Sequence, residues 1–349
     1  MYQRRPPCRP GNRQVKRMTD FTRRANLRVV YQSTDISADL QPFLLSWSYT
    51  EGLEQADDLQ ITVEDADGRW MNAWMPERGD RIRADILLSD GDGPRRLPCG
   101  LFSVDGHEHQ GPPDTMTIKA VSADVNSNGR REKRSKAWSK VSLRQVAEKI
   151  AAGARLRLNW QAGINSVYQK LSQSNQSDME FLLKLCAREG LRVKVGDGQI
   201  TVFPQKKFDA AAGVLTIRKG TDAVLSHSFK RDSVDTYRAA VIRYRDEKRK
   251  KVLEYTYNRP GAPADGQTLR ITERCESLAE ARRIAPARLM AANRGLMTAD
   301  ITMVGDERLL SGLNVKVAGW GRYDGKYAVE ETAHAGPAYT TALKLRQVT

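Results

Sequence analysis

Apolar and polar residues alternate along several short segments near both ends of the chain. In residues 43–49 every second residue, from Phe43 through Leu45 to Tyr49, is apolar, so these side chains should share one face. A period of two is typical of β-strands with one buried face. The same pattern predicts strands over residues 27–31, 58–64, 81–88, 214–217, 224–229, 237–244, 252–257, 297–303 and 313–317.

One stretch of this pattern occurs twice. Residues 100–120 and 325–345 match without a gap, and each reads as a strand, a Gly-Pro turn and a returning strand. The repeat predicts two related β modules, one near each end of the chain. Three copies of such a chain could present six similar modules in a ring. The matching pairs are Gly100 and Gly325, Phe102 and Tyr327, Val104 and Val329, His109 and His334, Gly111-Pro112 and Gly336-Pro337, Thr115 and Thr340, Ile118 and Leu343, and Lys119 and Lys344.

A helical period marks the middle of the chain. Ser142 can cap a helix expected over residues 142–152, where apolar residues recur every three or four positions. Ser177-Asp-Met-Glu180 has the form of a capping box and opens a second helix, which Gly190 ends. The remaining elements of this α+β segment are strands over 156–158 and 167–171 and a hairpin over 192–203.

Another helix is expected after the middle segment. Ser277-Leu-Ala-Glu280 is a capping box, and the helix that it opens should reach Asn293. Pro286 lies inside this helix and should kink or interrupt it, because proline cannot donate a backbone hydrogen bond. Residues 210–213 read as a linker between the middle segment and the strands that follow.

Together these elements predict a mainly β protein in which two related β-barrel-like modules flank a small α+β domain. Four parts are expected in chain order. They are a basic disordered extension over 1–24, a first β-barrel-like module over 25–127, an α+β middle domain over 128–209, and a second β-barrel-like module over 210–349 with a helix near 277–293.

The charge of the chain raises the question of a nucleic-acid partner. The net charge is +15 and the sequence pI is about 9.7, which is typical of proteins that bind DNA or RNA. The excess is concentrated in residues 1–24, 130–136 and 248–251. Such blocks are usually solvated tails or loops, and contact with DNA, RNA or an acidic partner is the alternative. No apolar run is long enough to span a membrane or to form a secretion signal.

His107 and His109 are candidate metal ligands, because residues two apart on a strand share a face. No further His or Cys follows at ligand spacing. The second copy of the repeat keeps His334 in place of His109 but has Thr332 in place of His107. A residue that recurs in both modules is better explained by the shared fold, for instance by a hydrogen bond that orders the turn.

Other candidate sites are equally weak. Asp65 and Asp67 lie in a turn, but the later ligands of a calcium-binding loop are missing. Asp178 and Glu180 are explained by helix capping, and the common nucleophile, phosphate, zinc and dinucleotide motifs are absent. We therefore predict no catalytic, cofactor-binding or metal-binding residue and no enzymatic activity. The cysteines should be free thiols: Cys8, Cys99, Cys186 and Cys275.

Several short motifs occur in a specific order and spacing over about residues 27–348. They are Trp47-Ser-Tyr with Asp57-Asp-Leu-Gln-Ile, Trp74-x-Pro-x-x-Gly-Asp80, Ser177-Asp-x-x-Phe-Leu-x-x-Leu-x-x-x-x-Gly190, the segment from Ala285 to Asn293, Leu310-x-Gly312-x-x-Val315, and Gly325-x-Tyr327-x-Val329-x-x-x-x-His334. In this respect the chain resembles the late control D family, the central hub of contractile phage baseplates. The same fold forms the N-terminal half of the type VI secretion spike protein, VgrG.

This resemblance implies a homotrimeric ring that adapts the sixfold tail tube to the threefold spike of a phage tail or tailocin. The lumen would pass the tape-measure protein and then DNA. The implied partners are the spike, tail tube, tape-measure and baseplate wedge proteins, and the implied location is the virion baseplate after assembly in the host bacterial cytoplasm. The sequence ends at Thr349, soon after the second copy of the repeat, so the spike is expected to be a separate protein.

Two other functions compete with the structural hub. The basic runs favour a nucleic-acid-binding protein, whose affinity would fall steeply with salt. A tail-associated cell-wall hydrolase is the third hypothesis, because two distant carboxylates can form a glycosidase site without a local motif.

Overall fold

The computed structural model describes residues 24–90, 93–122, 132–196, 198–220, 224–231, 236–246, 250–262, 266–275 and 277–348. Three segments discussed from the sequence lie largely or partly outside these ranges. The basic extension predicted over residues 1–24, with Cys8, lies outside the described residues except for Arg24. Parts of the basic runs at 130–136 and 248–251 lie outside them as well.

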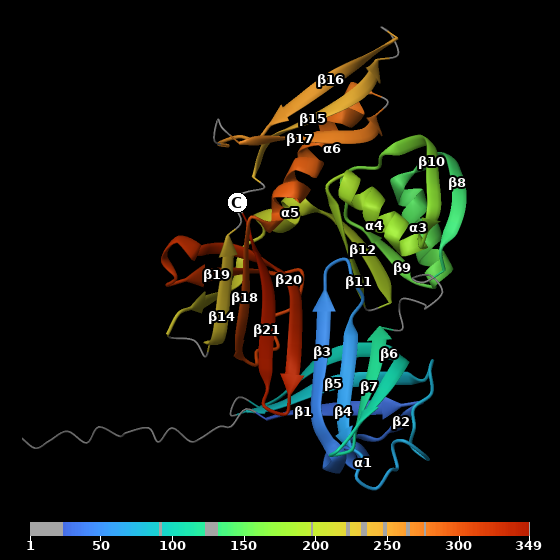
Figure 1. Cartoon of the computed structure of the whole chain (residues 1–349), viewed down its shortest axis with the longest axis vertical. Coiled ribbons are helices and arrows are strands. Elements are labelled where there is room, and N and C mark those ends of the chain that lie inside the picture. The colour runs from blue at the N-terminus through green and yellow to red at the C-terminus, as the bar shows by residue number, and fades with distance from the viewer. Residues whose placement is uncertain are drawn as a thin grey trace, which may run out of the picture.

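Thirteen described strands form one sheet, which runs across the molecule (Figure 1). The pairing order is β14-β18-β21-β20-β3-β4-β7-β6-β5-β1-β2, and β19 joins β20 to β13. The strands of its N-terminal part are β1 (Arg24–Tyr31), β2 (Thr34–Asp35), β3 (Leu44–Gly52), β4 (Asp58–Glu64), β5 (Arg81–Asp90), β6 (Gly93–Gln110) and β7 (Thr115–Ser122). Those of its C-terminal part are β13 (Gly213–Arg218), β14 (Val224–Arg231), β18 (Met297–Val304), β19 (Asn314–Ala318), β20 (Gly325–Gly336) and β21 (Thr340–Gln347).

The two parts of this sheet have the same strand order. β3-β4-β7-β6-β5-β1 corresponds strand by strand to β14-β18-β21-β20-β19-β13. Neighbouring strands are antiparallel in both runs, except that β13 and β19 are parallel whereas β1 and β5 are antiparallel. The duplication seen in residues 100–120 and 325–345 therefore extends to a run of six strands, far beyond the hairpin that reveals it in the sequence.

The correspondence holds at the level of single residues. The β6–β7 register shifts between Val104 and Gly106, and the β20–β21 register shifts between the equivalent Val329 and Glu331. A second pair of bulges lies at Leu45 in β3 and at Leu225 in β14. Leu45 was expected to share the buried face of its strand, but this bulge turns its side chain toward solvent, as it does for Leu225.

Each half of the sheet buries its own apolar core. In the N-terminal half the alternating residues of β4, such as Leu59, Ile61 and Val63, pack with those of β1, β5, β6 and β7. In the C-terminal half the equivalent residues of β18, Ala299, Ile301 and Met303, pack in a second core. Period-two burial of this kind is what the sequence pattern predicts for strands with one hydrated face.

The middle segment is a compact α+β unit with a separate core, made largely by α3, α4, β11 and β12. Both predicted N-caps are confirmed: Ser142 and Ser177 accept hydrogen bonds from the backbone N–H groups of Gln145 and Glu180. The later residues of the basic run at 130–136 belong to a strand, β8, which the sequence pattern did not predict. The elements are β8 (Arg134–Ser142), α3 (Leu143–Ala154), β9 (Arg157–Trp160), β10 (Val167–Gln176), α4 (Asp178–Arg188), β11 (Leu191–Gly196), β12 (Gln199–Pro204) and α5 (Gln205–Ala210).

A further sheet of three strands projects from the molecule and is packed against α6 (Figure 1). The expected interruption at Pro286 is wrong, because α6 continues through it as one helix. Ser277 caps α6, but the carboxylate of Glu280 bonds Arg188 of α4. The elements are β15 (Tyr237–Asp246), β16 (Lys251–Asn258), β17 (Gln267–Cys275) and α6 (Leu278–Ala292).

Short helical turns complete the described chain. None of the helices in the described ranges is both long and apolar enough to cross a bilayer. The turns are α1 (Ser37–Leu40), η1 (Gln41–Phe43), η2 (Asn293–Gly295) and η3 (Gly321–Tyr323).

Candidate assembly interface

The two halves of the large sheet meet at one strand pair. Residues Glu331–Gly336 of β20 pair antiparallel with Trp47–Gly52 of β3. The earlier part of β20 pairs with β19, so a single twelve-residue strand belongs to one module and extends the other. Segments that lie at opposite ends of the sequence therefore form a continuous backbone ladder in the middle of the sheet (Figure 1).

Aromatic side chains fill this junction. The His334 ring lies between Tyr49 and Tyr339, with ring centroids 6.3 Å and 5.9 Å away. Trp47 and Tyr339 are a further ring pair, with centroids 6.3 Å apart. At Gly336 a Cβ atom would stand 2.4 Å from the Trp47 indole, so glycine is needed for the close approach of the two strands.

His334 is fully buried in this junction. Its Nδ1 atom lies 2.9 Å from the Tyr339 hydroxyl and 3.3 Å from the Thr341 hydroxyl. Burial lowers the pKa of His334 to about 4, and the opposing effects of the Leu309 backbone and Asp306 are smaller. The ring is therefore neutral at pH 7 and acts as a packed, hydrogen-bonded component of the junction.

A buried ionic network joins the middle segment to both halves of the sheet. Arg192 of β11 has a side chain only 2% exposed. Its guanidinium lies 2.7 Å from Glu330 of β20 and 2.5 Å from Glu54, just after β3. Glu330 also binds Arg346 of β21 at 2.7 Å, and Arg346 binds Asp209 of α5 at 2.6 Å. This network connects three parts of the chain that each have their own core.

The charges of this network stabilise one another. Burial alone would raise the pKa of Glu330, but the hydrogen bonds and charges of Arg192 and Arg346 outweigh it, so this pKa lies below its ordinary value. Burial alone would lower the pKa of Arg192, but Glu330 and Glu54 outweigh it, so that pKa lies above its ordinary value. Both groups are ionised at neutral pH, and each depends on the other for compensation.

A second group of contacts, around Lys194, also joins the middle segment to both halves of the sheet. The Lys194 ammonium of β11 lies 3.0 Å from the Ser311 carbonyl oxygen and 3.4 Å from the Glu51 carboxylate. Glu51, at the end of β3, also accepts a hydrogen bond from the Ser311 backbone N–H. The middle segment is thus positioned on the sheet by charged groups on two consecutive outward positions of β11.

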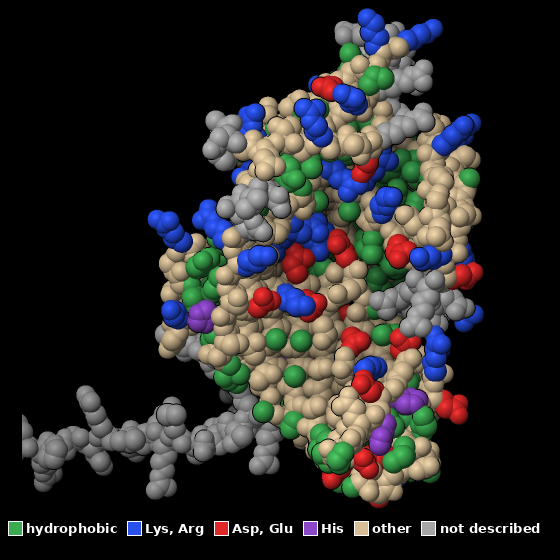
Figure 2. Space-filling model, in the orientation of Figure 1, with side chains coloured by type: hydrophobic (Ala, Val, Ile, Leu, Met, Phe, Trp, Pro, Cys, Tyr) green, Lys and Arg blue, Asp and Glu red, His purple; other side chains and the backbone are tan. Residues whose placement is uncertain are grey.

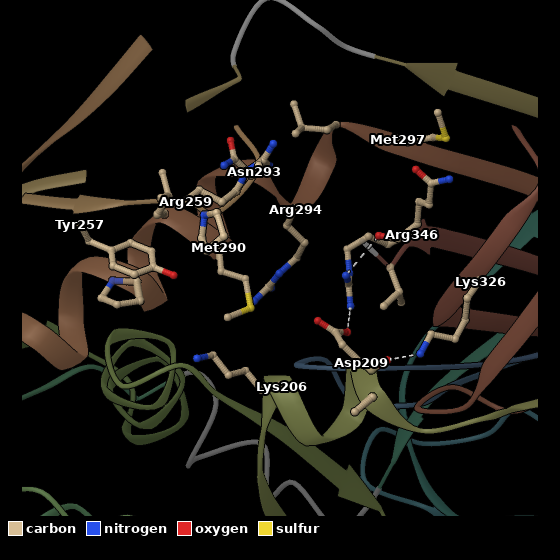
Figure 3. A pocket seen from close by; sticks show the side chains of 18 residues that line it. Lys206, Asp209, Tyr257, Arg259, Met290, Asn293, Arg294, Met297, Lys326 and Arg346 are labelled. Carbon is tan, nitrogen blue, oxygen red and sulfur yellow. Dashed lines mark hydrogen bonds and ion pairs between the residues drawn. The ribbon is translucent and has the colours of Figure 1, made fainter. Parts of the chain in front are cut away.

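A cavity of about 760 Å³ opens beside the network, between α5, α6 and the end of β21 (Figure 3). Asp209 of α5 bonds Arg346 across this space, and its backbone carbonyl accepts from Lys326 (Figure 3). Burial, and then the charge of Arg192, lower the pKa of Arg294 at the cavity wall. The cationic side chains around the cavity are Lys206, Arg259, Arg294, Lys326 and Arg346.

This cavity can hold an anionic group, since cations outnumber the single carboxylate of Asp209 among its described lining residues. It does not have the groups of an acyl- or glycosyl-transfer site. No serine, cysteine or histidine is among those lining residues, so a nucleophile paired with a base is absent there. The chemistry of this region is ionic positioning.

The histidines that the sequence suggested as candidate ligands or turn-ordering residues lie in different environments. His107 and His109 are exposed on β6, and His109 Nε2 lies 3.5 Å from the Asp65 carboxylate. Thr332, the counterpart of His107, is buried in the β3–β20 junction. His109 and His334 occupy equivalent positions opposite Met116 and Thr341, but they have different partners. Within the described ranges no three His, Cys, Asp or Glu side chains gather as metal ligands would.

The carboxylates considered as sites have structural partners. Asp65 is buried and accepts backbone N–H groups of Trp70 and Met71 at 2.8 Å and 3.0 Å, so it orders the turn after β4. Asp67 forms an ion pair with Arg69. Glu180 closes the capping box of α4, and the preceding Asp178 accepts a hydrogen bond from Gln173.

The described cysteines are free thiols inside the cores. Burial raises the pKa of both Cys99 and Cys186 above the ordinary value of a thiol. It raises the pKa of Cys275 to about 11. Thiols with raised pKa values are poor nucleophiles at neutral pH, which suits packing rather than chemistry.

The sequence pattern does not predict the residues of the ionic network. Alternation along β11 predicts an exposed Arg192, because its neighbours Leu191 and Val193 are apolar. The partner Glu330 is 138 residues away, and no local pattern connects the two. The only available signal was the presence of two basic residues, Arg192 and Lys194, in an otherwise apolar strand.

Comparison with known proteins gives a consistent result. No family model matches the chain. It is 32% identical over 191 residues to the "Probable baseplate hub protein" of Escherichia phage P2, an alignment that covers 53% of this chain and 46% of that protein. The chain therefore spans a little less than half the length of this curated relative.

Solved structures extend the similarity to most of the fold. A tail protein from Neisseria meningitidis MC58 has a TM-score of 0.68 at 13% identity, with 93% of this chain and 96% of that chain covered. An E. coli component of the type VI secretion system has a TM-score of 0.54 at 14% identity, with 88% and 74% covered. The resemblance to baseplate hub proteins and to the VgrG fold is confirmed, and the chain has a mainly β fold of the phage tail protein type.

Proposed function

We propose that this chain is the structural hub of a contractile phage tail baseplate or tailocin. In this role it forms a homotrimeric ring that adapts the sixfold tail tube to the threefold spike. The observation that carries the proposal is the duplicated run of six strands, joined within one chain by β3 and β20. Three copies of a chain with two equivalent modules provide a pseudo-sixfold surface. The relative in phage P2 supports this assignment.

The exposed face of the large sheet suits the wall of a channel. Its outward residues alternate with the buried core residues and are mostly small and uncharged, and Figure 2 looks onto this face across β18, β21, β20 and β3. Several of its charged side chains form close pairs, such as Lys344 with Glu331 at 2.7 Å and Lys119 with Glu108 at 2.6 Å. The smaller outward residues include Thr298, Thr302, Thr340, Ala342, Ala333, Ala335, Ser48, Thr50, Gln60, Thr62, Thr115 and Thr117.

A wall of this composition has few fixed charges to retain a passing polymer. Short hydroxyl and methyl side chains neither hold a phosphate backbone tightly nor offer a continuous apolar surface to a protein. We therefore assign the channel, through which the tape-measure protein and then DNA pass, to this face. The spike, tube and wedge proteins would contact the other parts of the ring.

In this proposal the chain has no catalytic role and acts by assembly in the virion baseplate. The relatives and solved structures described above are named as tail, baseplate or secretion-system components. The buried Arg192 guanidinium and the partly exposed Glu330 carboxylate compensate each other in a structural network. Neither feature favours a nucleic-acid-binding protein or a cell-wall hydrolase.

The mass of the assembled protein tests the proposal. Multi-angle light scattering of the purified full chain, and cryo-electron microscopy of complete particles, should both give three copies in one ring. A single copy per baseplate in complete particles would refute the homotrimer. Clearing of purified peptidoglycan by the chain would refute the purely structural role.

A further inference from the structure

In the row of strands that runs from β14 to β6, two strand edges have no partner strand among the described residues. One is the outer edge of β14, which pairs only with β18. The other is the edge of β6 over residues 106–110, beyond the part of β6 that pairs with β5. The two edges lie at opposite ends of the row that runs from β14 to β6 in Figure 1. Open edges of this kind are ready templates for pairing with another chain.

The junction inside the chain shows what such edges bind. β3 is the counterpart of β14, and β20 is the counterpart of β6. Within one chain, the outer edge of β3 pairs with the later part of β20. By the internal repeat, the two open edges are therefore equivalent to the two edges of β3 and β20 that pair with each other inside the chain. β14 is thus shaped to pair with residues 106–110 of β6 and with Gly111, which follows β6.

The burial of equivalent residues shows that this second junction is unfilled in a single chain. Trp47 and Tyr49 of β3 are 2% and 4% exposed, because β20 and Tyr339 cover them. Their counterparts in β14 are His227, which is exposed, and Phe229, which is half-buried. On the other strand, Thr332 and His334 are 0% exposed in the chain's own junction, whereas their counterparts on β6 are both exposed. Histidine side chains are visible at both ends of the row, over β14 and over β6 (Figure 2).

We propose that β14 of one copy of this chain pairs antiparallel with β6 of the next copy, in the register of the β3–β20 junction. This inference rests on the homo-oligomer of the proposed function and specifies its subunit interface. Transferring the register residue by residue gives the facing pairs: His107 with Arg231, Glu108 with Lys230, His109 with Phe229, Gln110 with Ser228, and Gly111 with His227.

The side chains in this register are complementary. Glu108 meets Lys230 of the neighbouring copy, and opposite charges directly across two strands stabilise their pairing. His109 meets Phe229 and so repeats the ring contact that His334 makes with Tyr49 inside the chain. His227 takes the position that Trp47 has in the internal junction, where Trp47 contacts Tyr339. Asp114 is the counterpart of Tyr339 in the first copy of the repeat, so His227 would lie close to Asp114 of the neighbouring copy.

The internal and external junctions differ in chemistry. Large apolar rings fill the first, whereas charged and polar side chains dominate the second. An interface with exposed charges on both sides keeps each edge soluble until a partner arrives. Because the two edges are different surfaces, the contact is head-to-tail, and such contacts close into a ring when the rotation between neighbours allows it.

A disulfide tests the register in the full chain. Facing residues of antiparallel strands have Cα atoms about 4.5–5.5 Å apart, within the range for a disulfide. The variant Glu108→Cys/Lys230→Cys, in a Cys8→Ser background, should give cross-linked species on non-reducing gels after mild oxidation. The control Glu108→Cys/Arg231→Cys moves one cysteine to the adjacent residue, which points to the opposite face. It should lose the cross-link, and the buried Cys99, Cys186 and Cys275 should not contribute.

The results separate the interface from the function. An oligomer by light scattering with a cross-link only in the first variant supports the pairing. An oligomer in which the first variant does not cross-link, or in which the control cross-links equally, overturns the pairing and leaves the hub assembly standing. A chain that remains a monomer overturns both the homo-oligomer and its interface.

Charge reversal gives a second measurement at the same pair. Glu108→Lys alone and Lys230→Glu alone each place like charges opposite each other and should shift the oligomer toward monomer. The combined variant restores opposite charges and should recover the oligomer. Recovery in the combined variant cannot come from an effect on the fold of either strand alone, so its absence would count against the predicted pair.

Discussion

Replacing Arg192 with methionine should destabilise the protein more than removal of any exposed cation. The substitution keeps an unbranched side chain of similar length but removes the charge from a site that is only 2% exposed. Three partners lose a donor: Glu330 at 2.7 Å, Glu54 at 2.5 Å and Gln205 at 3.0 Å. The carboxylates of Glu330 and Glu54, which are 22% and 29% exposed, then stay partly buried with part of their compensation missing.

The expected cost follows from these contacts. Removing one partner of a buried ion pair costs about 3–5 kcal/mol, because the remaining charge is left uncompensated. Glu330 keeps Arg346 at 2.7 Å in the variant, so the loss should fall at the lower end, about 3 kcal/mol. In the double variant Arg192→Met/Glu330→Gln, both charges are gone. Its free energy of unfolding should therefore exceed the value expected from adding the single effects, by about 1–2 kcal/mol.

Urea unfolding, followed by tryptophan fluorescence and by far-ultraviolet circular dichroism, measures the effect. Two probes are needed because a chain with several cores can unfold in more than one step. Arg243→Met is a matched control, since Arg243 forms an ion pair with Glu254 at 3.0 Å in which both side chains are mostly exposed. Exposed pairs of this kind contribute little, so the control should match the unchanged protein.

Two outcomes would refute this reasoning. If Arg192→Met unfolded at the same urea concentration as Arg243→Met, the network would not stabilise the junction. If the double variant lost the full sum of the two single effects, Arg192 and Glu330 would act independently, against the contact seen in the structure.

Two further predictions concern the β3–β20 junction. The pKa of His334 is lowered from 6.5 to about 4, so the unfolded state binds this proton more readily than the folded state. The free energy of unfolding should therefore fall as the pH drops from 6.5 toward 4. In thermal melts across this pH range, His334→Gln should lose that part of the pH dependence. Gly336→Ala places a Cβ 2.4 Å from the Trp47 indole and should cost about 1–3 kcal/mol in the same urea assay. Gly106→Ala, on the open edge of β6 with no atom within 4 Å, should leave stability unchanged, and an equal loss in both alanine variants would contradict the assigned role of the junction.

The pattern of apolar residues was sufficient to predict most of the strands and the main helices. It also revealed the repeat, because period-two burial and the Gly-Pro turn are local features that leave a direct trace in the sequence. The pattern did not reveal β17 or α5. Lys206, Lys207 and Asp209 make α5 look like a solvated linker, although Phe208 of the same helix is buried against Phe203.

The contacts between distant segments could not be predicted in this way. The sequence places the two modules at opposite ends of the chain, separated by the middle segment. In the structure, β3 and β20 join them directly through Trp47, His334 and Tyr339. Nothing near Trp47 in the sequence distinguishes a core residue of its own module from one that also meets β20. The repeat indicated that His109 and His334 occupy equivalent positions. It did not indicate that the two histidines have different partners, because these depend on which strand edge each histidine faces.

The shared use of β20 also has a consequence for how the chain folds during synthesis. β3 leaves the ribosome early, whereas its partner β20 is among the last strands to appear. Until then, the edge of β3 carries Trp47 and Tyr49 without the strand that covers them. Pairings between such distant segments form slowly, and exposed edges with aromatic residues are prone to aggregation meanwhile. Yield in the cell should therefore depend on chaperones that hold the N-terminal module until translation is nearly complete.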